Sequence, residues 1–236
     1  MPLTVRPCTP HDLPRAVAVE KSAFASNPFT PILFPGPFPA DALEFRLQEM
    51  ASQMTDDPTT RWLCVVDTDR PGPTEQGLRG ECDEGIAFAK WNLYIESSPG
   101  ARPMRKFGEG CNVEACEMVF GGLARQRERC LGGGGVCVSY DLCPLFIRVD
   151  DDSIIDLHIL VTDPAYGRRG AGGMLTQWGI DEAKKHNLPC YVESSTVGHE
   201  LYKRLGFRDL ELHSVDLSRF GATEPHETWA MIREAE

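Results

Sequence analysis

The chain of 236 residues holds 24 Lys and Arg against 35 Asp and Glu, which gives a formal net charge of −11, and 42% of its residues are hydrophobic. This composition is typical of a globular protein and excludes the disordered and fibrous classes. The negative charge would repel the phosphates of nucleic acids, so we expect no nucleic-acid partner. It would attract a cationic substrate such as an amine, although an acidic surface also serves solubility alone.

Length and cysteine usage narrow the class further. A chain of this length favours one domain with long insertions over two small domains. No stretch reaches the roughly 18 apolar residues of a membrane span, and the first residues show no apolar core of signal-peptide length. We therefore expect a cytoplasmic protein without a membrane partner. The nine cysteines contain no C-x-x-C pair, which predicts reduced thiols and no metal site.

The amino-terminal part predicts a strand followed by two helices. Residues 3–8 have the composition of a strand, and a helix follows with Thr9 as N-cap, Pro10 at its first position and an acid three residues after the cap. Residues 27–39 hold five prolines and are expected to form a loop. A second helix is expected over 40–53, because its leucines recur with helical spacing.

The middle of the chain predicts a hairpin and then an insertion. Residues 61–67 and 85–91 are apolar, β-branched runs with the pattern of paired strands. A helix is expected over 112–129. The glycine-rich segment 131–152 is either an inserted hairpin or an artefact of gene prediction, and no chemistry is assigned to it.

A strand that runs into a glycine-rich turn carries the clearest functional signal. Residues 154–161 predict a strand, residues 167–173 read G-R-R-G-A-G-G, and a helix follows because apolar residues recur at i, i+3, i+4 and i+7 from Ala171. Glycines let a ligand approach the backbone closely, and the free N–H groups of a helix start attract a phosphate. The spacing is neither that of a P-loop nor that of a Rossmann fingerprint. The glycines could also serve packing in a tight turn.

The motifs R-R-G-A-G-G-M-L at 168–175 and L-Y-K-R-L-G-F at 201–207 resemble the GNAT acetyltransferase superfamily. Its signature is [QR]-x-x-G-x-[GA], and Gly170 and Gly172 occupy the two glycine positions. Gly167 stands where Gln or Arg is usual, so a side-chain contact from that position is lost. The resemblance covers 155–208 firmly and the amino-terminal strand and helices loosely.

The resemblance implies an α/β fold of the GNAT type, with a mixed central sheet that splays open beside one strand and is flanked by helices. We expect one N-acetyltransferase domain over 1–236. Its cofactor-binding core is expected at 154–210, and a long insertion at 92–153 precedes the cofactor-binding strand.

The resemblance also implies acetyl-CoA as the co-substrate. Backbone groups of Leu160, Val161 and Thr162 are expected to pair with the pantetheine arm as if it were an added strand. Ser195 stands where many family members carry an asparagine near the pantetheine. The pyrophosphate is expected on the amides of the glycine-rich turn, namely those of Arg168, Arg169, Gly170, Ala171, Gly172 and Gly173.

The candidate catalytic residues follow from the same resemblance. Tyr202 matches the family's tyrosine that protonates the departing thiolate, although it could simply pack against the sheet. Asp156 lies where the family often places a base or a water-ordering carboxylate, and strict alternation along the strand would put His158 and Leu160 on its face. His158, with an unperturbed pKa of about 6.5, is the preferred base by a narrow margin. A buried histidine or a solvated strand end would be the structural alternatives. Glu193 is expected to be exposed or to face the substrate.

These residues together predict the transfer of an acetyl or short acyl group from acyl-CoA to a primary amine of a small molecule or peptide, by direct attack in a ternary complex. One alternative is a catalytically degenerate protein that binds acyl-CoA as a sensor or scaffold. Another is a regulatory protein without a CoA site. The sequence names neither the amine nor the oligomeric state.

Overall fold

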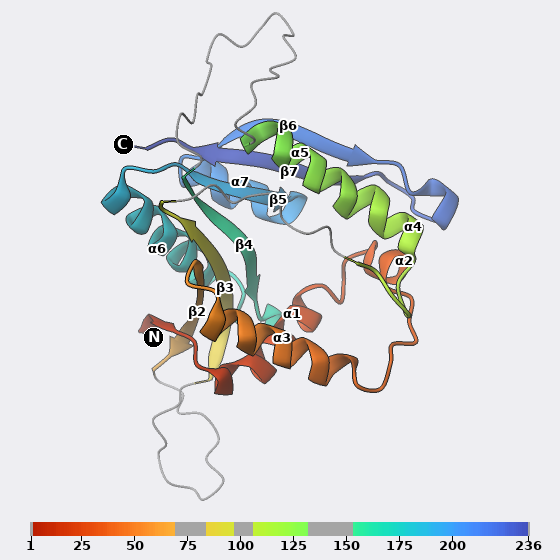
Figure 1. The fold of residues 1–236 in the computed structure, drawn as a ribbon, viewed down its shortest axis with the longest axis horizontal. Helices are drawn as coiled ribbons and strands as arrows, with labels where there is room; N and C mark the ends of the chain where they lie inside the picture. The colour runs from red at the N-terminus through yellow and green to blue at the C-terminus, as the bar shows by residue number, and fades with distance from the viewer. Residues whose placement is uncertain (1, 69–83, 97–105, 132–152, 236) are drawn as a thin grey trace, which may run out of the picture.

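The computed structural model describes residues 2–68, 84–96, 106–131 and 153–235. These residues form a seven-stranded sheet in the order β1-β2-β3-β4-β5-β7-β6, with helices on both faces (Figure 1). Neighbouring strands are antiparallel except for β4 and β5, which are parallel. The mixed, helix-flanked sheet is therefore confirmed. The strands are β1 Leu3–Pro7, β2 Thr60–Asp67, β3 Gly85–Tyr94, β4 Ile154–Thr162, β5 Cys190–Ser195, β6 Arg208–Val215 and β7 His226–Arg233.

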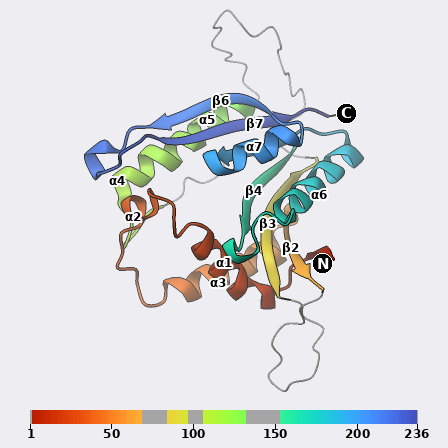
Figure 2. The ribbon, with the colours of Figure 1, turned by 180° about the vertical axis from the view of Figure 1, so that it is seen from behind.

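The helices divide between the two faces of the sheet. Helices α6 and α7 cover one face and α1, α3 and α5 cover the other, as Figures 1 and 2 show from opposite sides. The helices are α1 Leu13–Ala23, α2 Thr30–Leu33, α3 Ala42–Asp56, α4 Val113–Cys116, α5 Gly122–Leu131, α6 Ala171–His186 and α7 Thr196–Arg204, and the short turns are η1 Pro10–Asp12, η2 Glu117–Gly121, η3 Pro164–Tyr166 and η4 Ser218–Phe220. No helix among the described residues is long and apolar enough to cross a membrane.

Apolar residues on alternate strand positions build a core on each face. The core beneath α6 and α7 includes Trp91, Ile155 and Val192. The core beneath α1 and α3 includes Phe88 and Val161, and a separate cluster beneath α5 includes Ile154, Tyr191 and Ala230. Successive residues of a strand thus point to opposite faces, as the pleat requires. Sequence neighbours on β4 and β5 therefore face different helices.

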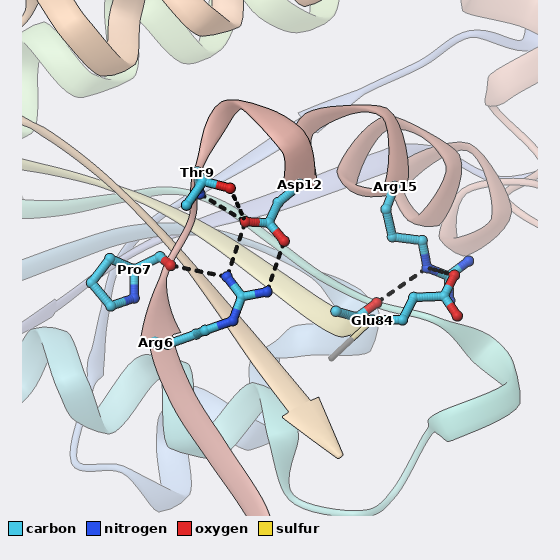
Figure 3. Close-up of polar contacts among 7 residues, drawn as sticks. Arg6, Pro7, Thr9, Asp12, Arg15 and Glu84 are labelled. Atoms are coloured by element: carbon cyan, nitrogen blue, oxygen red, sulfur yellow. Dashed lines mark hydrogen bonds and ion pairs between the residues drawn. The ribbon is translucent and has the colours of Figure 1, made fainter. Parts of the chain in front are cut away.

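The turn between β1 and α1 forms the capping box that the sequence predicts. The Thr9 amide donates to Asp12 Oδ2 at 2.7 Å, and Arg6 binds both carboxylate oxygens of Asp12, at 2.8 and 2.9 Å. Figure 3 shows this bidentate pair, with Arg15 nearby at 3.0 Å from Glu84. The charged contact fixes the entry of α1 onto the sheet.

Two cysteines lie beside this turn. Cys8, Asp12 and Cys64 place potential metal-ligand atoms within 4.8 Å of one another, and they are the one such group found among the described residues. Both oxygens of Asp12 already accept hydrogen bonds from Arg6, so a cation stands beside this carboxylate. The neighbouring Cys64 thiol and burial raise the pKa of Cys8, which disfavours the thiolate that a metal needs.

Several elements of the structure are not predicted by the sequence pattern. Strands β6 and β7 were not expected, and the proline-rich segment 27–39, expected to be a loop, contains the one-turn helix α2. The expected helix over 112–129 is a continuous run of α4, the π-helical η2 and α5, and Asn112 caps it by accepting from the Ala115 amide at 3.2 Å. The possible hairpin at 131–152 lies almost wholly outside the described residues.

Candidate active site

The central feature is the divergence of β4 from β5. Although β4 has nine residues and β5 six, they pair only at Ile155 with Cys190, Asp156 with Tyr191 and Leu157 with Val192. Beyond this point the two strands separate, as Figure 1 shows. Backbone groups at the end of β4 that face β5 are therefore not used in a ladder with it. The splayed sheet predicted from the sequence is confirmed.

A β-bulge at His158 changes which side chains share a face. On β3, Lys90 pairs with Ile159 and the next residue pairs with Leu157, so the register shifts by one residue at His158. Leu157 and Leu160 both pack with the core beneath α6. The expected common face of Asp156, His158 and Leu160 is therefore wrong, because one extra residue inverts the alternation. His158 is exposed, whereas Asp156 is 2% exposed.

The glycine-rich turn brings the start of α6 against the end of β4. Gly170 is the N-cap residue with φ of 89°, a conformation that favours glycine, and Arg168 also has a positive φ of 61°. The first-turn amides of Ala171 to Gly173 have no partner within the helix. A Cβ added to Gly172 would lie 3.8 Å from both Leu160 Cδ2 and Thr162 Oγ1. The anion-binding end of α6 thus lies beside the part of β4 that leaves β5.

The glycines of this turn are not required for packing. The closest atom to a Cβ on Gly172 would be Leu201 Cδ2 at 3.6 Å, and for Gly173 it would be Leu201 Cδ1 at 3.9 Å, which are ordinary contacts. Gly179 differs, because a Cβ there would lie 2.2 Å from Trp91. Packing against the described residues therefore does not require glycine at 172 or 173. The lack of a side chain at these positions lets another group approach the backbone closely.

The two arginines of the turn differ in their environment. Arg168 is exposed. Arg169 lies 2.8 Å from Asp67 Oδ2, and the Asp67 side chain is 2% exposed. The Arg169 guanidinium also lies 5.9 Å from the ring centroid of Tyr166. The Arg169 side chain thus ties the turn to the end of β2.

Tyr202 lies on α7, in the core that α6 and α7 cover. It is 5% exposed, and its ring meets that of Phe207 edge-on with centroids 5.7 Å apart. Burial alone raises the pKa of Tyr202 above its usual value of 10.0. The hydroxyl therefore stays protonated at neutral pH, as a proton donor must. Ser195 is the exposed N-cap residue of α7 at the diverging end of β5.

A row of buried polar side chains runs across the sheet to Asp156, on the face opposite to α6 and α7. Thr60 Oγ1 lies 3.2 Å from Asn92 Oδ1, and Asn92 Nδ2 donates to Asp156 Oδ2 at 3.2 Å. The exposed fractions of Thr60, Asn92 and Asp156 are 4%, 5% and 2%. The Thr60 contact orients the Asn92 amide so that its NH₂ group faces the carboxylate. Asp156 is thus held at the last part of the sheet before β4 and β5 diverge.

The sequence leaves Glu193 either exposed or facing the substrate; the first alternative is wrong, and the second stays a prediction for this residue. Its side chain is 15% exposed, Oε2 accepts from Arg127 Nη2 at 2.5 Å, and Oε1 accepts from the Tyr191 hydroxyl at 3.2 Å. Arg127 belongs to α5, 66 positions earlier in the chain. The sequence did not predict this pair because no local pattern relates α5 to such a distant strand.

The geometry agrees with comparisons to known proteins. Residues 89–207 match the model of the Acetyltransferase (GNAT) family. The chain belongs to this family. The matched range contains β4, the glycine-rich turn, α6, β5 and α7, which are the elements that form the diverging strands and the candidate anion site.

Solved structures share the fold at low sequence identity. A mosquito arylalkylamine N-acetyltransferase like 5b is 16% identical with a TM-score of 0.58, over 99% of this chain and 100% of that chain. A structure from Corynebacterium glutamicum titled histone acetyltransferase HPA2 and related acetyltransferase is 20% identical with a TM-score of 0.56, over 100% of this chain and 98% of that chain. These likenesses concern the fold alone.

Curated relatives match over shorter stretches. A probable acyltransferase SID5 of Ajellomyces capsulatus is 40% identical over 48 residues, 20% of this chain and 35% of the relative. An uncharacterized N-acetyltransferase of Schizosaccharomyces pombe is 32% identical over 54 residues, 23% of each chain. The matches thus span about a third of the first relative and about a quarter of the second.

Proposed function

We propose that this protein transfers an acetyl or short acyl group from acyl-CoA to a primary amine of a small molecule or peptide. The observation that supports it most is the position of the α6 start beside Leu160 and Thr162, where β4 has left β5. The backbone groups of Leu160, Val161 and Thr162 that point away from β3 would hold the pantetheine arm by strand-like hydrogen bonds. The amides from Arg168 to Gly173 would hold the pyrophosphate.

Acetyl-CoA, when bound, supplies the activated carbonyl that the amine attacks. Asp156 would accept the proton that the amine loses, either directly or through a water molecule, and burial together with the Asn92 hydrogen bond supports this role over the exposed His158. Tyr202 would donate a proton to the departing sulfur. Ser195, at the start of α7, would lie along the pantetheine.

Two measurements test this function. Calorimetry should show that acetyl-CoA binds the protein and that Gly172→Val weakens binding by at least tenfold while the variant stays folded. Release of free thiol should then identify an acceptor among polyamines, amino acids, aminoglycosides, arylamines and peptide amino termini. Equal affinity in the folded Gly172→Val protein would contradict the assigned site.

The pH dependence of turnover separates the two candidate bases. With saturating acetyl-CoA, Asp156→Asn should lower turnover by about 10² or more, the usual contribution of a general base. His158→Gln should leave the acidic limb of the profile in place. The reverse result would make His158 the base.

A second candidate is a protein that binds acyl-CoA without transferring the acyl group. Two observations favour it: Gly167 offers no side chain where the family has Gln or Arg, and the Arg169 side chain binds Asp67. Tight binding of acetyl-CoA without thiol release across the amine panel would support this alternative.

A further inference from the structure

A charged cluster of the buried Asp156 and the half-buried Arg127 and Glu193 lies where β4 and β5 begin to diverge. Asp156 belongs to the paired part of the two strands, and Glu193 is the first residue of β5 after the last pair, Leu157 with Val192. Two carboxylates therefore lie on adjacent strands at the inner end of the candidate site. Burial and the negative charge of Asp156 both raise the pKa of Glu193, and the charge of Arg127 opposes the rise.

The single arginine of this cluster comes from the insertion. Arg127 lies within hydrogen-bond distance of Glu193, its side chain is 20% exposed, and the charges of Glu193 and Asp156 both raise its pKa. Its Nε is buried without a hydrogen-bond partner among the described residues. One cation thus faces two carboxylates, and the cluster keeps a net negative charge.

Helix α5 is held firmly enough to place this arginine. Gln126, which is 0% exposed, donates from Nε2 to the Glu211 carbonyl of β6 at 2.9 Å. At Gly122 the helix approaches β6 so closely that an added Cβ would lie 2.2 Å from the His213 ring. Arg127 directly follows Gln126 on this helix. The contacts that hold α5 against β6 therefore also fix the position of the Arg127 charge.

Other polar and titratable side chains near Asp156 lie on β3 and β5 and have partners of their own. Tyr191 of β5 donates to Glu193, and burial raises the pKa of the Cys190 thiol to about 12. On β3, Asn92 is neutral and donates to Asp156, while Lys90 Nζ donates to Gln53 of α3 at 2.8 Å. Among the described residues, Arg127 and Glu193 form an ion pair whose two charges are each coupled to the charge of Asp156.

We infer that Arg127 and Glu193 form a positioning pair that keeps Asp156 ionised and ready to accept the amine proton. This inference rests on the proposed function, because it deepens the role of Asp156 there. Arg127 binds and neutralises Glu193, so the remaining negative charge of the cluster resides on Asp156. Without the arginine, one of these two carboxyl groups on adjacent strands would take up a proton, since neighbouring like charges disfavour double ionisation.

The first test measures the proton directly and needs no turnover. The carboxyl ¹³C resonance of Asp156, assigned with Asp156→Asn, is titrated in protein labelled at aspartate and free of acetyl-CoA. Arg127→Gln should raise its titration midpoint by about one pH unit or more, and adding Glu193→Gln should reverse this rise. Arg129→Gln is the matched control, because it removes another arginine of α5 that pairs with Glu211 at the surface; it should leave the midpoint unchanged.

The second test measures turnover with saturating acetyl-CoA and an accepted amine. Arg127→Gln should lower turnover about tenfold at neutral pH, with recovery at higher pH, since one unit in the midpoint is a tenfold change in the ionised fraction. Adding Glu193→Gln to Arg127→Gln should restore the turnover of the double variant. Arg127→Lys should keep part of the wild-type turnover. If Arg127→Gln does not fold, Glu193→Gln alone should lower the midpoint of Asp156.

Three outcomes would overturn the inference or separate it from the function. Equal midpoints in Arg127→Gln and Arg129→Gln would overturn it, as would a loss of turnover that is the same at every pH and is not rescued by Glu193→Gln. A wild-type protein that binds acetyl-CoA but acetylates no amine would contradict the proposed function and with it the catalytic purpose of the pair, while the titration would still show whether the charges are coupled.

Discussion

Arg169 of the glycine-rich turn forms an ion pair with Asp67 at the end of β2, with 2.8 Å between Nη2 and Oδ2. The carboxylate is 2% exposed and the guanidinium side chain 26% exposed, so the pair lies at the edge of the core. A phosphate near this turn would have to compete with Asp67 for the Arg169 side chain. The pair therefore stabilises the turn more than it provides a free cation for a ligand.

We expect Arg169→Ala to lower the free energy of unfolding by about 1–3 kcal/mol, because a buried carboxylate loses its cation while the exposure of the arginine reduces the effect. Affinity for acetyl-CoA should fall less than fivefold. Chemical denaturation and calorimetry measure the two quantities. Arg168→Ala, at the exposed neighbour, is the control and should leave the stability unchanged. A large loss of affinity with unchanged stability would make Arg169 a phosphate ligand instead.

Gly173→Ala should make the protein more stable and bind acetyl-CoA less well. Alanine favours the helix over glycine by up to about 1 kcal/mol, and the nearest described side-chain atom to the added Cβ, Leu201 Cδ1, lies 3.9 Å away. The same methyl group would occupy space expected to receive the pyrophosphate. Thermal unfolding and calorimetry measure the two effects on one variant.

Gly179→Ala on the same helix is the matched control for this substitution. Its Cβ would lie 2.2 Å from Trp91, so overpacking should lower the free energy of unfolding by about 1–3 kcal/mol. Unchanged affinity in Gly173→Ala would show that the glycines of the turn do not serve a ligand.

Tyr202→Phe should preserve the fold and acetyl-CoA affinity and lower turnover by roughly 10²–10⁴, the usual contribution of a general acid. The phenyl ring keeps the contact with Phe207, and the lost hydroxyl makes no hydrogen bond to any described residue. Because burial raises the pKa of Tyr202 above 10.0, its ionisation should add no basic limb to the wild-type profile below pH 10. Unchanged turnover at saturating substrates would reduce Tyr202 to a core residue.

The parts of the site that the sequence predicts are those encoded locally. Strand β4, the glycine turn and α6 are continuous in the chain, so alternation, glycine spacing and helical period all fall within residues 154–186. The family signature lies within the same stretch. These elements therefore appear in the structure with nearly the predicted bounds.

The parts that the sequence could not predict depend on pairing between distant segments. The bulge at His158 exists only relative to β3, and no pattern within β4 reveals an extra residue. The contact of Arg127 with Glu193 joins helix α5 to strand β5. Strand β6 mixes exposed residues, such as Asp209 and Ser214, with polar residues that face α5, such as Glu211 and His213. Apolar and polar residues therefore do not alternate clearly in the hairpin of β6 and β7, and the sequence predicts its strands poorly.

His226, a half-buried residue at the start of β7, faces the loop that follows α1. The His226 ring meets Phe29 edge-on with centroids 4.8 Å apart, and its Nδ1 is buried without a partner among the described residues. Burial, followed by the nearby charge of His213, lowers the pKa of His226 below its usual value of 6.5. The folded protein therefore holds this imidazole neutral under conditions in which the unfolded chain would protonate it.

His226→Phe should reduce the loss of stability between about pH 6.5 and pH 5. The unfolded chain takes up a proton as pH falls through about 6.5, whereas folded His226, with its lowered pKa, does so only at lower pH. The free energy of unfolding therefore falls with pH in this window, by at most about 1.4 kcal/mol per pH unit for one site. The carboxylates whose pKa is lowered, including Asp12 and Asp57, lose their contribution to stability only at more acidic pH.

Phenylalanine at position 226 keeps the ring contact with Phe29 and cannot titrate. Urea denaturation of His226→Phe at half-unit pH intervals should therefore give a flatter curve of unfolding free energy against pH. His11→Asn, at an exposed histidine, should retain the wild-type slope, and an unchanged slope in His226→Phe would place the acid sensitivity elsewhere.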